Sequence, residues 1–248
     1  MTVEGGDARG EPIATKPVQT RRRRGRNADA IDLGSLMAGP AQSSAVTQWV
    51  DEPGDGRPRG PLGLGRAWLE VQLRPRRFFG SGVAPGDQAP ALSFAVVVTL
   101  AAVGGRLLVA PATLSGYASL AEATASPYLT AAVVLGVATV LVAPLVLHLG
   151  AALATLGLAA LVDDRAGVSE TVQVTAYAAA PGVFVAVPLP AVQVAALAYA
   201  CVLFAVGLAV VHGTSRRRAA LAAALPALFV FGLAFGGIAA LDAVIAGA

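Results

Sequence analysis

The sequence predicts an all-α integral membrane bundle of five transmembrane helices, preceded by a short N-terminal interfacial helix. The first observation is composition: 56% of the 248 residues are hydrophobic, 13% are charged, and the mean hydropathy is +0.68. An ordinary soluble domain is about 25% charged. The second is a series of apolar runs long enough to cross a bilayer. The third is a recurrence of arginines in alternate loops, which is typical of multi-pass proteins.

Charge divides the chain into regions. Of the 18 basic and 15 acidic residues, 23 precede residue 88. We therefore expect a polar N-terminal third, in which residues 1–45 and residues 46–87 are distinct segments, followed by a membrane domain at 88–248. The single Cys201 excludes an internal disulfide, so cysteine content does not indicate a redox compartment.

Residues 1–45 have few large apolar side chains and contain the basic run Arg21 to Arg24. Such a segment cannot bury a core, and we expect a disordered basic extension. A tail of this kind is able to bind anionic lipid or nucleic acid. For the arginines at 74–77, nucleic acid is not the expected partner, because so much membrane sequence follows them. A second interpretation stays open: translation starts at Val46, decoded as Met from a GUG codon, and residues 1–45 are an artefact of start-site assignment.

The next segment, 46–87, is expected to be a cytoplasmic lead-in. Leu64, Trp68 and Val71 recur at helical spacing, which predicts an amphipathic helix in the membrane interface with Trp68 at headgroup depth. Pro75 is expected to end this helix. The cations beside it, next to Phe78 and Phe79, are interpreted as membrane-edge anchors: Arg74, Arg76 and Arg77.

The membrane spans follow from apolar length, because about 20 helical residues cross about 30 Å of hydrocarbon. We expect spans at about 92–110, 128–161, 172–187, 192–211 and 219–246. The second run would be about 50 Å long if straight. It is therefore expected to tilt, to kink at Pro144, or to project into the cytoplasm.

Loop charges predict the orientation. Arginines precede the first span, Arg165 follows the second, and three more precede the fifth: Arg216, Arg217 and Arg218. The loops at 111–127 and 188–191 have no Lys or Arg. The bias of positive charge toward the cytoplasm then predicts a cell-membrane protein with a cytoplasmic N-terminus and an extracellular C-terminus. Pro188 and Pro190 favour a tight turn, although a kink that merges the third and fourth runs stays open.

The third run contains the most specific polar pattern. Gln173, Tyr177 and Pro181 are spaced four apart and share one helix face. Pro181 leaves the carbonyl of Tyr177 without its helical donor, which permits a kink. Ser169 is expected to cap the helix. One interpretation is that these side chains bond neighbouring helices; the alternative is a polar path for a solute, shared with His148.

No set of residues predicts catalysis. His148 follows Pro144 in the second run, but the sequence has no HExxH motif, paired cysteines or acidic cluster, so no metal or cofactor is expected. His148 is more simply interpreted as a packing residue that bonds a neighbouring helix. Gly232 and Gly236 form a GxxxG pattern that lets another helix approach, either within this chain or from another copy.

The chain resembles the Yip1 domain family of multi-pass membrane proteins, most closely its prokaryotic members of the halophilic-archaeal type. The resemblance rests on Val168 to Thr171 with Tyr177 and Pro181, on Val187-Pro188, and on the basic loop 213–219 before a span with Pro226. It covers about residues 49–246 and implies a five-span bundle with a cytoplasmic N-terminus. Eukaryotic relatives act in vesicle traffic and bind small GTPases, in compartments that a prokaryote lacks, so that activity is not implied here.

Two functions remain on the sequence alone. The first is a non-enzymatic scaffold or membrane-organising protein, with membrane lipids and other membrane proteins as partners. The alternative is a small-solute transporter or channel-like subunit with a polar path near His148, Gln173 and Tyr177. Carriers of ions or protons usually keep ionisable groups at mid-depth, and the scarcity of such groups in the spans favours the scaffold.

Overall fold

A computed structural model describes residue 2 and residues 60–247. The predicted basic extension at 1–45, and the part of the lead-in before residue 60, lie outside the described residues. Contacts divide the chain into two units, Met1–Gln42 and Ser43–Ala248. All the helices described below belong to the second unit.

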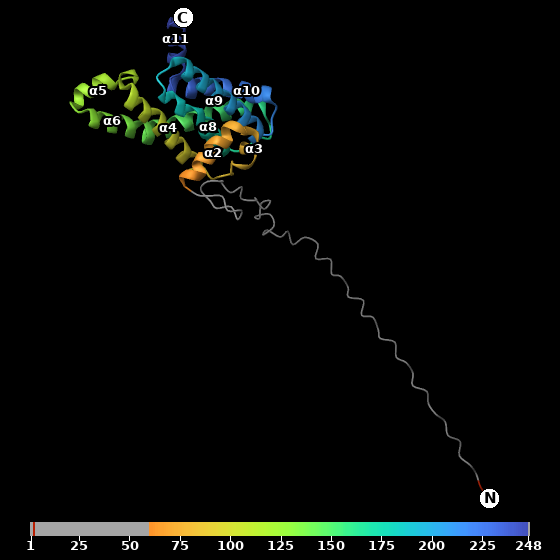
Figure 1. Ribbon diagram of the computed structural model, residues 1–248. Coiled ribbons are helices and arrows are strands. Elements are labelled where there is room, and N and C mark those ends of the chain that lie inside the picture. Colours follow the sequence, from red (N-terminus) through yellow and green to blue (C-terminus); the bar gives the residue numbers. More distant parts are fainter. Residues whose placement is uncertain (1, 3–59, 248) are drawn as a thin grey trace. The chain divides into compact units, whose positions relative to one another are not determined.

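The described part of the chain is all-helical, as expected. Figure 1 shows α8 in the middle of the bundle, where it packs against α4, α7 and α9, while α3 packs on α9 and α10 packs on α7 and α9. The elements in order are α2 (Pro61–Leu73), α3 (Pro75–Ser81), α4 (Ala89–Val109), η1 (Pro111–Thr113), α5 (Tyr117–Thr124), α6 (Pro127–Gly136), η2 (Val137–Val142), α7 (Ala143–Leu161), α8 (Val168–Ala178), η3 (Ala180–Ala186), α9 (Pro190–Val211), α10 (Arg216–Ala227), η4 (Leu228–Ala234) and α11 (Gly237–Gly247).

Within the described residues, four helices are long and apolar enough to cross a membrane. They are Ala89–Val109, Pro127–Leu161, Pro190–Val211 and Arg216–Ala234. The expected third span does not form one long helix, because α8 stops at Ala178 and the chain continues as the 3-10 helix η3. A count of five spans therefore does not follow from helix length.

Pro144 and Pro226 each lie beside a π-helical segment. One residue, Ala143, separates η2 from Pro144, and one residue, Ala227, separates Pro226 from η4. A proline removes one helical hydrogen bond, and the wider π turn changes the local bonding pattern without ending the helix. The second apolar run accordingly continues through Pro144 to Leu161.

The final run ends earlier than expected. The π-helix η4 stops at Ala234, and α11 begins as a separate helix at Gly237. Gly236 has φ of 81°, in the left-handed region that glycine adopts at low cost. The spacing of apolar residues continues across this break, which is why the sequence predicted one span over 219–246.

Glycine determines how closely the helices approach. A Cβ on Gly207 of α9 would lie 2.6 Å from Val174 Cγ1 on α8, and one on Gly150 of α7 would overlap with Val230 Cγ2 on η4. Backbones pack this closely only where one side lacks a side chain, as is common in membrane bundles.

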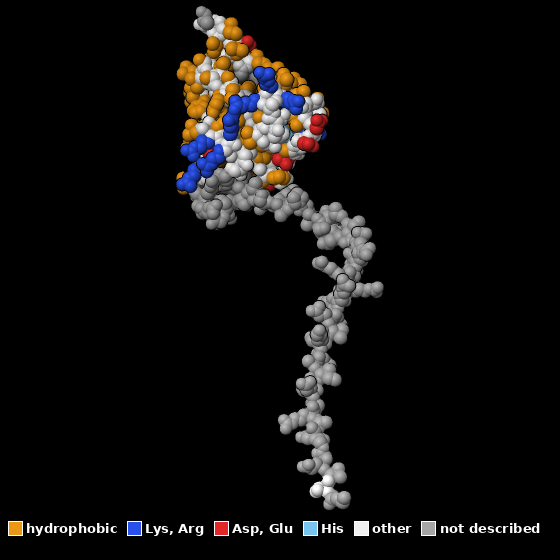
Figure 2. Space-filling model, turned by 90° about the vertical axis from the view of Figure 1, so that its right-hand side faces the viewer, with side chains coloured by type: hydrophobic (Ala, Val, Ile, Leu, Met, Phe, Trp, Pro, Cys, Tyr) orange, Lys and Arg blue, Asp and Glu red, His pale blue; other side chains and the backbone are white. Residues whose placement is uncertain are grey.

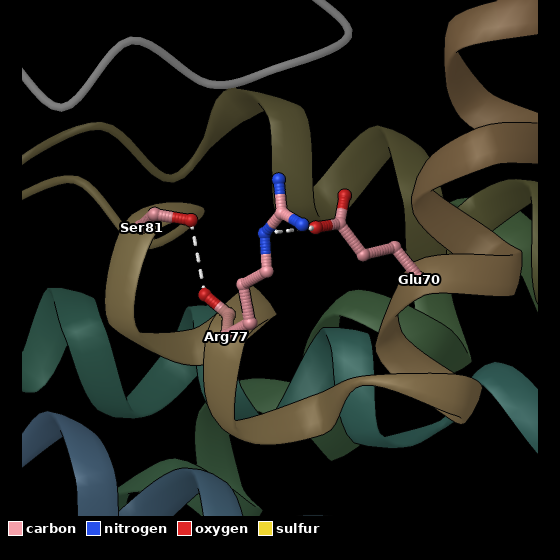
Figure 3. Close-up of polar contacts among 3 residues, drawn as sticks. All are labelled: Glu70, Arg77 and Ser81. Atoms are coloured by element: carbon pink, nitrogen blue, oxygen red, sulfur yellow. Dashed lines mark hydrogen bonds and ion pairs between the residues drawn. The ribbon is translucent and has the colours of Figure 1, made fainter.

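The N-terminal helices form a corner on the bundle. Pro75 ends α2, as expected, but it also starts α3. Figure 3 shows that Arg77 reaches back to Glu70, with its Nε 3.4 Å from Oε1, while the hydroxyl of Ser81 donates to the carbonyl oxygen of Arg77 at 3.0 Å. The corner directs Phe78 and Phe79, each 2% exposed, into the core.

Candidate functional site

The centre of the bundle is the α8–η3 segment, and Gln173 is its main polar group. Its side chain is fully buried. Its Nε2 donates to the carbonyl oxygen of Ala84 at 2.6 Å, and its Oε1 accepts from the N–H of Ala84 at 3.0 Å. Ala84 lies in the connection between α3 and α4. One amide side chain thus satisfies both backbone groups of a buried loop residue, which would otherwise be costly to bury.

Tyr177 lies one turn further along the same face of α8 and is also fully buried. Its ring makes edge contacts with Phe78 of α3, at a centroid distance of 4.8 Å, and with Phe94 of α4, at 5.1 Å. Such tilted aromatic pairs contribute beyond the apolar area they bury. Tyr177 joins three helices.

The break between α8 and η3 receives a hydrogen bond from another helix. The indole N–H of Trp68 on α2 donates to the carbonyl oxygen of Ala180 at 2.8 Å. Pro181 stands at the start of η3 and so begins a new helical segment; it does not kink a continuous helix. Trp68 is half-buried, and its ring lies 5.9 Å from that of Phe184. The headgroup-depth placement of Trp68 stays a prediction, but its donor is used inside the protein.

The far end of η3 has a second amide, which the sequence analysis missed. Gln193 on α9 is 8% exposed. Its Nε2 donates to the carbonyl oxygens of Val185 at 3.1 Å and Val187 at 2.8 Å. The signal was available, because Gln193 is a single amide just after Pro190 at the start of an apolar run.

The start of α8 differs from the expected cap. The residue before the helix is Gly167, and no side chain caps it. Ser169 lies inside the first turn, and its hydroxyl is buried without a hydrogen-bond partner in the described part of the chain. Glu170 occupies the first turn, where its charge is favourable.

His212, which directly follows α9, is hydrogen-bonded to this end of α8. It is 3% exposed, and its Nε2 lies 3.2 Å from the hydroxyl of Thr171. That hydroxyl donates to Gly167, so it accepts from His212. The ring Nδ1 is buried without a partner among the described residues. Burial, and to a smaller extent the charge of Arg165, lower the pKa of His212 to about 4.

His148 does not join Gln173 and Tyr177. It lies exposed on α7, and its Nδ1 is 2.7 Å from the carbonyl oxygen of Pro144 in its own helix. The structure therefore brings two of the three expected path residues onto one buried face and places the third on the outside of the bundle. The bond of His148 to a neighbouring helix, which the sequence suggested, is instead a bond within α7.

A cavity of about 580 Å³ opens elsewhere in the bundle. Its walls come from α4, the η2–α7 segment, the start of α9, and the η4–α11 connection. Most of the lining is Ala, Val and Leu, and neither Gln173 nor Tyr177 contributes to it. Among the described residues that line it, Arg106 is the one that carries a charge.

Arg106 is held in place at the cavity by Thr113. Its Nε lies 3.2 Å from Thr113 Oγ1, and its Nη2 lies 2.7 Å from that oxygen and 3.1 Å from the carbonyl oxygen of Thr113. Nη1 donates to no residue within 60–247. The sequence does not predict this anchoring, because the path of the chain between α4 and Thr113 is not determined by helical periodicity.

The other arginines of residues 60–247 lie on the surface. Figure 2 shows a face on which arginine and acidic side chains gather beside hydrophobic surface. The exposed arginines of the predicted basic segments are Arg74, Arg76, Arg77, Arg216, Arg217 and Arg218. The last three form the first turn of α10, whose cap is the Ser215 hydroxyl, 3.4 Å from the N–H of Arg218.

The glycine pair Gly232 and Gly236 is not packed closely against a distant helix in this structure. The atoms nearest to a Cβ on Gly232 would be those of Leu228 and Ile238, and nothing lies within 4 Å of one on Gly236. A second helix at this pair, from another copy, stays a prediction. Within residues 60–247 no three His, Cys, Asp or Glu side chains gather as metal ligands.

Comparison with known proteins gives one match. The model of the Yip1 domain family matches residues 69–238, which run from α2 to the start of α11. No curated protein and no solved structure matches the chain. Since the family model covers more than half of the 248 residues, the chain belongs to the Yip1 domain family, as its resemblance in the third run and the basic loop predicted.

Proposed function

We propose that this Yip1 domain protein is a non-enzymatic organiser of the membrane: a five-span bundle that presents an arginine-rich cytoplasmic edge to lipids and other membrane proteins. The observation that carries the proposal is the internal use of the central polar groups. Gln173 is bonded at both ends of its amide to Ala84, and Tyr177 is enclosed by Phe78 and Phe94. These contacts hold α8 against α3, α4 and the connection between them.

The course of α8–η3 supports a fifth crossing. Near its start, Gln173 bonds Ala84, just before α4; near its end, Ala186 lies so close to Gly105 of α4 that a Cβ there would be 2.5 Å from Ala186 Cβ. The two segments therefore run side by side in the same direction. A chain that crosses with α4 crosses again with α8–η3.

The length of α8–η3 agrees with a crossing. The α-helix has 11 residues and the 3-10 helix has 7. At about 1.5 Å and about 2.0 Å per residue, these add up to about 30 Å, the thickness of the hydrocarbon core. A tighter helix reaches across with fewer residues, which is why the segment falls short as a single α-helix.

Arginine placement supports a cytoplasmic N-terminus and an extracellular C-terminus in the cell membrane. Arg216 to Arg218 occupy the first turn of α10, where the positive end of the helix dipole disfavours cations. A cost of this kind is consistent with a topological role for the three charges. The same edge carries Arg74, Arg76 and Arg77, and anionic lipid is its natural partner.

Site-specific labelling tests the topology. In a Cys201→Ala background, we would introduce Leu189→Cys between η3 and α9, with Ser115→Cys as the outside control and Thr214→Cys as the inside control. A membrane-impermeant maleimide should label positions 189 and 115 in intact cells, and position 214 only after permeabilisation. Labelling of position 189 only after permeabilisation would contradict the five-span proposal.

Recovery of the wild-type protein in native lipid nanodiscs tests the organising role. We expect a protein that co-purifies in stoichiometric amount, or an enrichment of anionic lipid. A triple variant in which Arg74, Arg76 and Arg77 are all replaced by Gln should reduce the amount of that protein or lipid. Arg66→Gln, exposed on α2, is the control. If neither protein nor lipid is enriched, the organising role is wrong.

The transporter alternative has its own measurement. The structure does not connect His148 with Gln173 and Tyr177, so no observation favours a path through them. Solute flux in proteoliposomes that is lost in Tyr177→Phe would reverse this conclusion.

A further inference from the structure

The Arg106 cavity is a feature that the proposed function does not use. It lies near the end of α4 at which Ala186 approaches Gly105, whereas the arginine-rich edge lies at the other end of the bundle. Its volume of about 580 Å³ falls within the usual range for small-molecule sites. A ligand of this cavity has to complement an apolar lining and one cation that is held in place.

The geometry of α4 sets the depth of the cavity. Ala95, Thr99, Ala102 and Arg106 all line it, and they fall on one face of the helix. From Arg106, in the last turn, to Ala95 is a rise of about 16 Å along the helix axis. That is about half of the hydrocarbon thickness. The cavity therefore extends over one leaflet, with its cation at the depth of the headgroups and its apolar part among the acyl chains.

Charge determines which end of a ligand is held. Arg106 is the one charged residue among the described residues of the lining, so no carboxylate of the lining neutralises it. Thr113 fixes two of its nitrogens, while Nη1 has no partner within 60–247. A guanidinium with a free donor in apolar surroundings favours an anion, and it suits phosphate oxygens in particular.

We propose that this cavity binds one anionic phospholipid, with the phosphate at Arg106 and an acyl chain along the wall formed by α4 and the η2–α7 segment. Thr113 acts as a positioning residue that holds the guanidinium toward the phosphate. The proposal goes beyond the organising role at the cytoplasmic edge, and it does not depend on which side of the membrane that edge faces.

Native mass spectrometry of the full chain tests the proposal. The delipidated protein would be titrated with phosphatidylglycerol and with phosphatidylcholine of the same acyl chains. We expect one phosphatidylglycerol bound preferentially. Arg106→Gln should lower the preference for phosphatidylglycerol about tenfold or more, since a hydrogen bond between charged groups is lost, and Arg106→Lys should restore part of it. Arg165→Gln, in the loop after α7, should leave the preference unchanged.

A second pair of variants tests the acyl part of the site. Ala138 lies in the cavity wall, so Ala138→Phe places a ring inside the cavity. Ala132 is exposed on α6 and outside the lining, so Ala132→Phe is the matched control. Only Ala138→Phe should displace the lipid. Equal binding of the two lipids by the wild type, or unchanged binding in Ala138→Phe, would overturn the proposal. If millimolar inorganic phosphate displaced phosphatidylglycerol completely, the cavity would be a site for an ion alone, and the proposal would also be overturned.

A measurement on the wild type alone keeps the proposal falsifiable if the variants fold poorly. Phosphatidylglycerol with a photoreactive group on its acyl chain should crosslink to peptides of α4 and η2–α7. Crosslinks spread evenly over all lipid-facing helices would show an ordinary lipid annulus and refute a specific site.

Discussion

The side-chain amide of Gln173 is bonded to both backbone groups of Ala84, its Nε2 at 2.6 Å from the carbonyl oxygen and its Oε1 at 3.0 Å from the nitrogen. The two residues are 89 positions apart in the sequence. This pair fixes the entry of α4 against the first turns of α8. Because the chain changes from an α-helix to a 3-10 helix after Ala178, and Pro181 has no N–H to donate, contacts from outside help to hold the third segment in place.

Gln173→Leu should destabilise the protein by about 2–5 kcal/mol, since it leaves a buried N–H and a buried carbonyl of Ala84 unpaired. The free energy of unfolding, measured by denaturant titration in mixed micelles, checks this. Gln88→Leu is the control, because Gln88 at the start of α4 makes no side-chain cap bond. Equal stability of the two variants would show that Ala84 is satisfied in another way.

Trp68→Phe should cost about 1–2 kcal/mol. It removes the donor to Ala180 but keeps an aromatic ring against Phe184. Thermal unfolding in detergent measures the change. Trp49→Phe, outside the described residues, serves as the reference substitution. If Trp68→Phe unfolds at the wild-type temperature, the indole bond makes no net contribution to stability.

Gly207→Ala and Gly136→Ala should act in opposite directions. The new Cβ at 207 would meet Val174 at 2.6 Å and the ring of Phe79 at 3.0 Å, whereas nothing lies within 4 Å of a Cβ at 136. The first variant should lose about 1–3 kcal/mol by overpacking, and the second should gain up to about 1 kcal/mol from helix propensity. Paired unfolding curves decide; loss of stability in both would indicate that helical glycines matter here for another reason.

Stability should fall as the pH is lowered from about 6.5 toward 4, because of His212. Its folded-state pKa is about 4, against an ordinary value of 6.5. In that window the unfolded chain binds more protons than the folded chain, so the free energy of unfolding decreases with decreasing pH. His212→Gln should flatten this dependence, whereas His148→Gln, exposed on α7, should keep it. Unfolding midpoints across pH 4–7 make the comparison, and parallel curves for wild type and His212→Gln would refute it.

The fold class, the family and the places of four long apolar helices can be predicted from the amino-acid sequence. These follow from composition, from apolar length and from the pattern around Tyr177 and Pro181, all of which are local properties of the chain. Burial in a bilayer demands satisfied backbone groups, so a long apolar run in a membrane protein is restricted to a helix. A long apolar helix can therefore be predicted from the sequence, whereas a break inside an apolar run, such as those after Ala178 and Ala234, cannot.

Which polar groups meet depends on how the helices pack, and the sequence does not show it. Gln173 finds Ala84, Trp68 finds Ala180, Gln193 finds the end of η3, and Arg106 finds Thr113. The first two contacts join residues 89 and 112 positions apart, and the last two cross short connections between consecutive elements. Periodicity does not say which donor a freed carbonyl meets in either case. The cavity of the proposed lipid site arises for the same reason, since its walls are faces of helices that come together only when the bundle packs.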